Sequence, residues 1–262
     1  MENGSHFGVR LKWLGCACFE LDFNGFTVVT DPWISDNRCT DLTWEAVEHC
    51  DCIALTHGHF DHILDIPHLA KKFPTRILCG EATAIPLMQW ADVNPMGVYP
   101  MSPNLELDMD RISVKALFGR HGVLPGTANE RIASIKTHPV VGADPRLQEL
   151  FFRGDLEYRN YLFTTPGGTR LLFWGNQLVL PELRNLLVKE HPDILILQVT
   201  DSRTPAIAAK LCAQFGCKAV IPHHMDFPRD YRHIVDALGE ELAKHAPQTR
   251  CIVPAYGQWI CL

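Results

Sequence analysis

The sequence reads Cys52-Ile53-Ala54-Leu55-Thr56-His57-Gly58-His59-Phe60-Asp61-His62 at its most informative point. The apolar run at the start of this stretch predicts a buried strand, and three imidazoles and one carboxylate follow the strand closely. Burying these groups without partners is unfavourable, whereas neutral imidazole and carboxylate together match the ligand preferences of Zn²⁺, Mn²⁺ or Fe²⁺. The stretch therefore predicts a divalent metal site at the end of a strand.

The spacing of the four ligand side chains indicates two half-sites. His57 and His59 lie two residues apart in an extended loop, so both can point toward one ion, while Asp61 and His62 can turn toward a second. Each half-site needs further ligands from distant parts of the chain. The candidates all follow predicted strands, and they are His121, Asn176 and His224.

The remaining histidines and the cysteines give no such pattern. Cys16-Ala17-Cys18 has one residue between its thiols, which is not the usual two-residue spacing of a metal or redox pair. Several other cysteines lie in apolar runs, where a reduced cysteine acts as a small hydrophobe. Surface positions or ordinary hydrogen bonds are expected for the other histidines, which are His6, His49, His68, His138, His191, His233 and His245.

The order of predicted elements favours an α/β protein. Strands are expected over Val9–Leu14, Phe19–Phe23, Phe26–Thr30, Asp51–Thr56, Ile112–Phe118, Tyr161–Thr165, Arg170–Trp174, Ile194–Val199, Lys218–Ile221 and Cys251–Pro254. Helices are expected over Ile63–Phe73, Glu81–Trp90, Pro181–Glu190, Pro205–Phe215 and Arg229–His245. The stretch 121–155 shows no clear pattern. Two strand-rich halves with helices outside would form a four-layer αββα sandwich in one domain over residues 1–262.

Composition narrows the expected partners. The formal net charge is −6 and the basic residues do not cluster, which argues against nucleic-acid binding. No apolar segment approaches the length of a membrane span, and no leader pattern opens the chain, so a cytoplasmic protein that does not bind membranes is expected. A homo-oligomer is compatible with the sequence.

The motif His57-x-His59-x-Asp61-His62 resembles the signature of the metallo-β-lactamase superfamily. The segments Trp13-Leu14-Gly15, Thr30-Asp31-Pro32-Trp33 and Ile221-Pro222-His223-His224 are similar to the branch that contains ascorbate-6-phosphate lactonase and the phospholipase D acting on N-acyl phosphatidylethanolamine. The resemblance implies His121 as the third histidine of the first site. It also implies His224 rather than His223 as the last ligand, with His223 as the alternative.

One position departs from the family pattern. The resemblance implies a Gly-Asp pair after the second hairpin, with the aspartate bridging two metals, but this chain has Gly175-Asn176. A neutral amide offers one carbonyl oxygen, so it binds hard cations more weakly than a carboxylate and bridges two ions poorly. One or two ions are therefore expected, with Asp201 as a candidate compensating carboxylate.

Other polar residues are candidates for supporting roles. Asp31 follows a strand at the edge where the family places supporting residues, so it can hydrogen-bond a ligand histidine or form a turn. An arginine can hold the phosphate or carboxylate of a substrate by paired hydrogen bonds. The candidates are Arg120, Arg131, Arg203 and Arg229.

The resemblance implies a metal-dependent hydrolase that opens a lactone or cleaves a phosphoester of a small anionic metabolite. Asp61 would orient the attacking water or accept its proton, and His224 would stabilise the developing oxyanion. One alternative is a phosphodiesterase or nuclease of the same fold, which requires an extended basic groove. Another is a metal-poor binding or regulatory protein, in which Asn176 marks the loss of catalysis.

Overall fold

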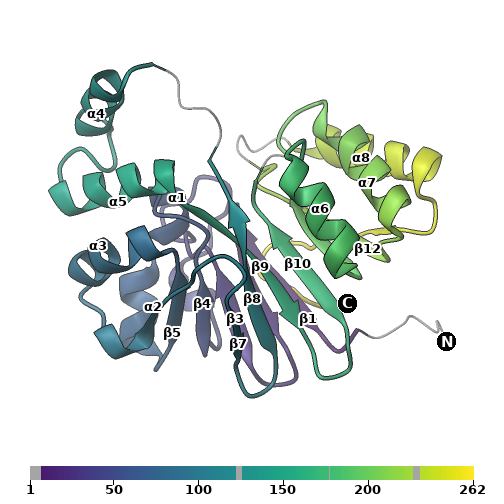
Figure 1. Cartoon of the computed structure of the whole chain (residues 1–262), viewed down its shortest axis with the longest axis horizontal. Coiled ribbons are helices and arrows are strands. Elements are labelled where there is room, and N and C mark those ends of the chain that lie inside the picture. The colour runs from purple at the N-terminus through teal and green to yellow at the C-terminus, as the bar shows by residue number, and fades with distance from the viewer. Residues whose placement is uncertain (1–6, 122–125, 177, 227–230) are drawn as a thin grey trace.

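Two sheets lie face to face, and helices cover the outer face of each (Figure 1). This computed structural model describes residues 7–121, 126–176, 178–226 and 231–262. One apolar cluster fills the space between the sheets and continues under the helices of the C-terminal half, and a second lies between the first sheet and its own helices. The predicted four-layer α/β sandwich is therefore confirmed.

The first sheet is built almost entirely from the N-terminal half, in the order β14-β1-β2-β3-β4-β5-β6. Its strands are β1 (Arg10–Gly15), β2 (Cys18–Asp22), β3 (Thr27–Thr30), β4 (Cys52–Ala54), β5 (Arg76–Cys79), β6 (Val98–Pro100) and β14 (Trp259–Cys261). Positive φ angles of 54° at Asn24 and 89° at Gly25 form the expected turn between β2 and β3. Pairing is antiparallel from β14 to β3 and parallel from β3 to β6.

The second sheet has the order β13-β12-β11-β10-β9-β8-β7. Its strands are β7 (Glu106–Asp108), β8 (Ser113–Gly119), β9 (Tyr158–Thr164), β10 (Arg170–Trp174), β11 (Ile194–Gln198), β12 (Ala219–His223) and β13 (Arg250–Cys251). The expected strand Cys251–Pro254 is wrong in extent, because β13 ends at Cys251. The chain then crosses to the first sheet, where β14 pairs with β1.

The helices are short and lie outside the two sheets. They are α1 (Phe60–Ile63), α2 (Ile66–Lys72), α3 (Glu81–Ala91), α4 (Ala128–Lys136), α5 (Pro145–Leu156), α6 (Pro181–Glu190), α7 (Thr204–Phe215) and α8 (Arg232–His245), with 3₁₀ turns at Trp44–Ala46 and Pro95–Gly97. None of the helices in the described ranges is long and apolar enough to cross a membrane.

The expected helix Ile63–Phe73 is divided into α1 and α2. Pro67 lies in the first turn of α2, where its missing N–H does not interrupt a helical hydrogen bond. The Asp65 carboxylate, at the break, accepts hydrogen bonds from the backbone N–H groups of Ile34 at 2.6 Å and Ser35 at 2.8 Å. A continuous helix would remove these contacts, so the break holds the loop after β3 in place.

The stretch 121–155 contains two helices within its described residues. Thr127 caps α4 and exchanges hydrogen bonds with Glu130, and Asp144 precedes α5 with its side chain on the backbone N–H of Arg146. Helix α5 lies beside α3 and above the end of β4, and α4 lies farther from the sheets (Figure 1). This stretch therefore covers one side of the sheet edge.

The strand directions bring the predicted ligands to one edge. Strands β1, β3 and β4 run in the same direction, and so do β8, β10 and β12. Their carboxyl ends therefore lie at a common edge within each sheet. The residues that follow these ends are Cys16, Asp31, His57, His121, Asn176 and His224.

Candidate metal centre

The first ligand group consists of His57, His59 and His121. Its three ligand nitrogens all lie within 4.8 Å of one another. His57 and His59 are buried, and His121 is partly exposed. Because His121 follows a strand of the second sheet and the other two follow β4 of the first, this group joins the two halves of the molecule.

The second group is built around Asp61. Its Oδ2 lies 3.5 Å from Nε2 of His62 and 3.5 Å from Nε2 of His224. The ring centroids of His57 and His62 are 4.1 Å apart, so the two groups are adjacent. The Sγ of Cys16 also lies within 4.8 Å of the ligand atoms of Asp61 and His224.

Asp31 fixes the orientation of His62. One Asp31 oxygen accepts the backbone N–H of Thr56 at 2.7 Å, and the other accepts the Thr56 hydroxyl at 2.7 Å and lies 2.8 Å from Nδ1 of His62. The expected hydrogen bond from Asp31 to a histidine of the motif is therefore confirmed. Because this hydrogen bond occupies Nδ1, the other ring nitrogen of His62, Nε2, faces Asp61. Carboxylates that orient metal-binding histidines make the same kind of contact.

Helix α5 supports His59. Nε2 of His59 lies 2.9 Å from Oδ1 of Asp155, and Arg131 of α4 donates to both oxygens of that carboxylate. The His59 ring stacks on Phe151 with centroids 4.2 Å apart. At Gly154 a Cβ atom would lie 2.7 Å from the His59 ring, so only glycine allows α5 to approach this closely. The stretch 121–155 thus positions a ligand candidate.

Asn176 lies beside the site with both side-chain atoms engaged by the protein. Its Oδ1 accepts a hydrogen bond from Asn160 at 2.9 Å, and its Nδ2 donates to the carbonyl of Arg120 at 2.7 Å. The neighbouring Tyr158 stacks on His57 at 4.4 Å and donates its hydroxyl to the carbonyl of Gly175. Asn176 therefore serves the packing around the histidines, and its carbonyl oxygen keeps at most one lone pair for an ion.

His223 and His224 occupy different environments. His223 is fully buried between aromatic rings, its Nε2 lies 3.2 Å from the carbonyl of Trp174, and burial lowers its pKa to about 3. His224 adopts a left-handed φ of 57°, which directs its side chain toward Asp61 instead. The structure thus brings His224, and not His223, to the second group.

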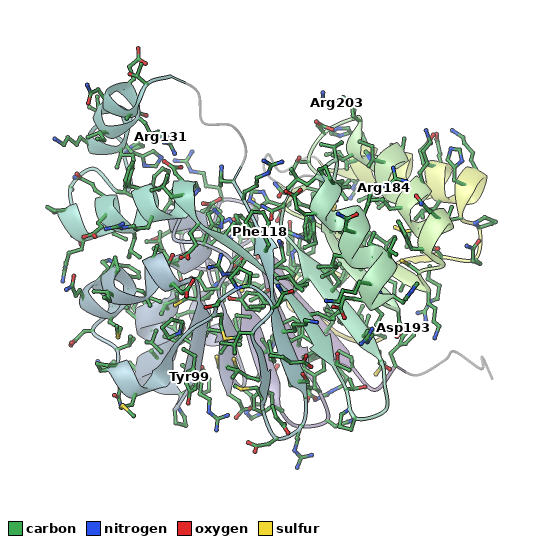
Figure 2. The ribbon with its side chains drawn as sticks, viewed as in Figure 1. Tyr99, Phe118, Arg131, Arg184, Asp193 and Arg203 are labelled. Carbon is green, nitrogen blue, oxygen red and sulfur yellow. The ribbon has the colours of Figure 1, made fainter. Side chains whose placement is uncertain are left out.

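The other predicted residues in the described ranges are not members of either group. Asp201 accepts the backbone N–H of Thr204 and pairs with Arg203 at 2.9 Å, so its oxygens are engaged at the surface. Arg131 is paired with Asp155, and Arg120 lies 3.9 Å from Glu182. Figure 2 shows Arg131 and Arg203 on opposite sides of Phe118. Arg229 falls outside the described residues.

The ionisation of His57, His121 and Asp61 suits metal binding, whereas the pKa of His62 is raised, because Asp61 and Asp31 outweigh the effect of its burial. Burial, reinforced by the neighbouring imidazoles, holds the pKa of His57 well below its ordinary value and lowers that of His121 to about 4. Burial alone would raise the pKa of Asp61, but His62 and His224 outweigh it and lower the pKa. At neutral pH these groups therefore offer imidazole lone pairs and a carboxylate.

The ligand atoms of the site fit a divalent metal ion. The first group presents three imidazole nitrogens, which is the ligand number of many catalytic zinc sites. Asp155 and Asp31 act on His59 and His62 as outer partners that orient metal-binding histidines.

Sequence reasoning did not identify three residues that shape this site. Asp155 is the last residue of the unassigned stretch and Tyr158 is the first residue of β9, and their only signal is their position before and within that strand. Cys16 was considered only as part of a pair with Cys18. The structure separates the two, because Cys16 belongs to the cluster between the sheets and Cys18 to the cluster under the first sheet.

Comparisons with known proteins agree with this architecture. A metal-dependent hydrolase of Geobacillus sp. (strain WCH70) is 27% identical over 223 residues, which are 84% of this chain and 87% of that protein. A metal-dependent hydrolase of Koribacter versatilis is 37% identical over 73 residues, and this alignment spans 31% of that protein and 28% of this chain. A metallo hydrolase of Ignicoccus hospitalis has the same fold, with a TM-score of 0.68, 15% identity and coverage of 97% of this chain and 98% of that one.

The family model described as Beta-lactamase superfamily domain matches residues 10–224, which include every ligand candidate named above. The resemblance carried by the motif from His57 to His62 is therefore confirmed. The chain therefore belongs to the family of beta-lactamase superfamily domains.

Proposed function

We propose that this protein is a metal-dependent hydrolase that acts on a small anionic substrate, by opening a lactone or cleaving a phosphoester. The observation that carries the proposal is the convergence of the ligand nitrogens of His57, His59 and His121 within 4.8 Å, beside the group around Asp61. The relatives named above are metal-dependent hydrolases, which supports the same class of activity.

A divalent ion bound at these residues supplies a Lewis acid that lowers the pKa of water and polarises the bond under attack. Asp61 is 22% exposed and remains ionised, so it can orient a water molecule and accept its proton. His224 is 20% exposed, and its Nε2 lies 3.5 Å from Asp61, so it can donate a hydrogen bond to the negative charge that develops on the substrate.

A cavity beside the second sheet offers room for the substrate. It measures about 500 Å³ and is lined by residues at the carboxyl end of β11 and the start of α7, among them Gln198, Thr200 and Arg203. Strand β11 lies between β10 and β12, so the cavity opens at the edge that carries Asn176 and His224. Its volume is in the range of small-molecule sites, and its lining includes the ion pair of Arg203 with Asp201.

The test combines metal analysis with activity. Protein purified without added metal is analysed for bound ions, then assayed with Zn²⁺ or Mn²⁺ on matched lactones and phosphoesters that carry or lack a negative charge. We expect stoichiometric metal and turnover of an anionic substrate. The variant His57→Ala should bind one ion fewer. Its turnover should fall by more than the loss of about 10- to 100-fold that is typical when a residue supporting a metal ligand is replaced. His245→Ala, on the outer surface of α8, is the control that should change neither.

Each other outcome contradicts a specific part of the proposal. Stoichiometric metal without turnover of either substrate class would exclude the proposed hydrolase activity. Turnover of nucleic acid with a steep loss of affinity at higher salt would favour the nuclease alternative. Neither metal nor turnover would leave the binding or regulatory role.

A further inference from the structure

The second ligand group lacks a carboxylate at position 176 and has a cysteine side chain nearby. Asn176 is neutral, and its amide is engaged by Asn160 and by the carbonyl of Arg120. Across the group, the Sγ of Cys16 lies within 4.8 Å of the ligand atoms of both Asp61 and His224. Sulfur, carboxylate and imidazole therefore come together from three segments that are far apart along the chain.

The backbone around Cys16 is held at both ends. Its N–H donates to Oδ2 of Asp226 at 2.9 Å. Its carbonyl accepts the backbone N–H of His224 at 3.2 Å and the indole N–H of Trp13 at 3.1 Å. The direct link to His224 ties the loop after β1 to the loop after β12. Cys16 and His224 thus keep a fixed relation to each other, as two ligands of one ion require.

The side-chain direction of Cys16 follows from its backbone conformation. Cys16 has a left-handed φ of 49° in the tight turn between β1 and β2, and it is fully buried. Cys18, two residues later, lies in the strand β2 and packs into the cluster under the first sheet. The two thiols therefore lie in different apolar clusters, and of the two only Cys16 belongs to the ligand group.

We propose that the thiolate of Cys16 is a ligand of the second metal ion, together with Asp61, His62 and His224. On binding, the thiol proton is released to solvent and a sulfur–metal bond forms, with no change of oxidation state. The thiolate supplies the negative charge that Asn176 does not. Because sulfur is a soft ligand, the second site should prefer Zn²⁺ or Co²⁺ to Mn²⁺. The proposal rests on the metal-binding part of the proposed function and does not depend on the substrate.

The test uses Co²⁺ as the probe. The full chain, freed of metal and loaded with Co²⁺, should bind two ions and show the near-ultraviolet charge-transfer band of a thiolate–cobalt bond. Cys16→Ser should lose the band and one ion but keep the ion at His57, His59 and His121. Cys18→Ser is the matched control and should keep both. X-ray absorption of the Zn²⁺-loaded protein should show sulfur at about 2.3 Å, absent in Cys16→Ser.

The outcomes separate this proposal from the proposed function. Two ions without a thiolate band, or a band that survives in Cys16→Ser, would overturn the role of Cys16 and leave a metal-dependent hydrolase possible. Binding of only one Co²⁺ ion, without the thiolate band, would also overturn the role of Cys16. Failure to bind any Co²⁺ or Zn²⁺ would overturn both proposals. If Cys16→Ser does not fold, the zinc–sulfur distance in the native chain and the intact band in Cys18→Ser decide the question.

Discussion

Asp31 shows at the scale of one residue how this site is assembled. It is buried, and its two oxygens contact Thr56 at the end of β4 and Nδ1 of His62. It thereby joins the end of β3 to the start of the ligand loop. A single carboxylate fixes both the loop backbone and the ring of one ligand candidate.

Replacing Asp31 by asparagine should weaken metal binding without removing a ligand. The amide would donate to Nδ1 of His62 and so place the ring proton on Nε2, the nitrogen that faces Asp61. We expect the affinity for the second ion to fall about 10- to 100-fold, measured by competition with a chelator. Asp36→Asn, at an exposed position of the following loop, is the control. Equal affinity in Asp31→Asn and the native protein would show that this hydrogen bond does not orient His62.

At the scale of one element, α5 is part of the site rather than a cover over it. Asp155, Phe151 and Gly154 all lie on the face of the helix that touches His59. Arg131 of α4 completes the contact by pairing with Asp155. The position of His59 therefore depends on how closely α5 approaches the ligand loop.

Gly154→Ala tests this close approach. The added methyl would meet the His59 ring at 2.7 Å and the backbone nitrogens of Gly58 and His59 at 3.0 Å. We expect a loss of about 1–3 kcal/mol in the free energy of unfolding, measured with urea, together with weaker binding of the first ion. Gly239→Ala is the matched control. That helical position of α8 has open space around it, so alanine should stabilise by about 0.5–1 kcal/mol. A similar gain in Gly154→Ala would refute the close approach.

At the scale of the whole molecule, buried thiols should make stability depend on alkaline pH. Burial raises the pKa of Cys50 and of Cys79 from 9.0 to about 12. Between pH 9 and 12 the folded state keeps these protons, while the unfolded chain releases them. The free energy of unfolding therefore falls as the pH rises through this window, by about 1.4 kcal/mol per pH unit for each thiol.

The pH dependence can be assigned with single variants. Cys50→Ala, unfolded with urea under reducing conditions, should show a slope shallower than that of the native protein by about 1.4 kcal/mol per pH unit above pH 9. Leu69→Ala removes a buried side chain that does not titrate, so it should lower stability at each pH and keep the native slope. Identical slopes for Cys50→Ala and Leu69→Ala would mean that the thiol at position 50 does not contribute.

Several elements could be predicted because their signals are local. The turn at Asn24-Gly25, the strand before His57 and the alternating elements of the last third all follow from short sequence patterns. Strand β5 carries little local signal, because its apolar run is only the three residues Ile77, Leu78 and Cys79. Strand β14 was missed because its three residues are partly exposed, and they form a strand only by pairing with β1. Helices α4 and α5 carry readable caps at Thr127 and Asp144, in a stretch with little periodicity.

The sequence by itself determined the main ligand candidates of the site, because the spacing from His57 to His62 and the strand before it place several of them in one short segment. It also showed that position 176 has no negative charge. The resemblance also named His121 and His224, but only the tertiary structure brought Asp155 and Cys16 to the site. These two residues reach it because the strand directions and the approach of α5 bring together segments that are far apart along the chain. Such contacts have no local periodicity to reveal them.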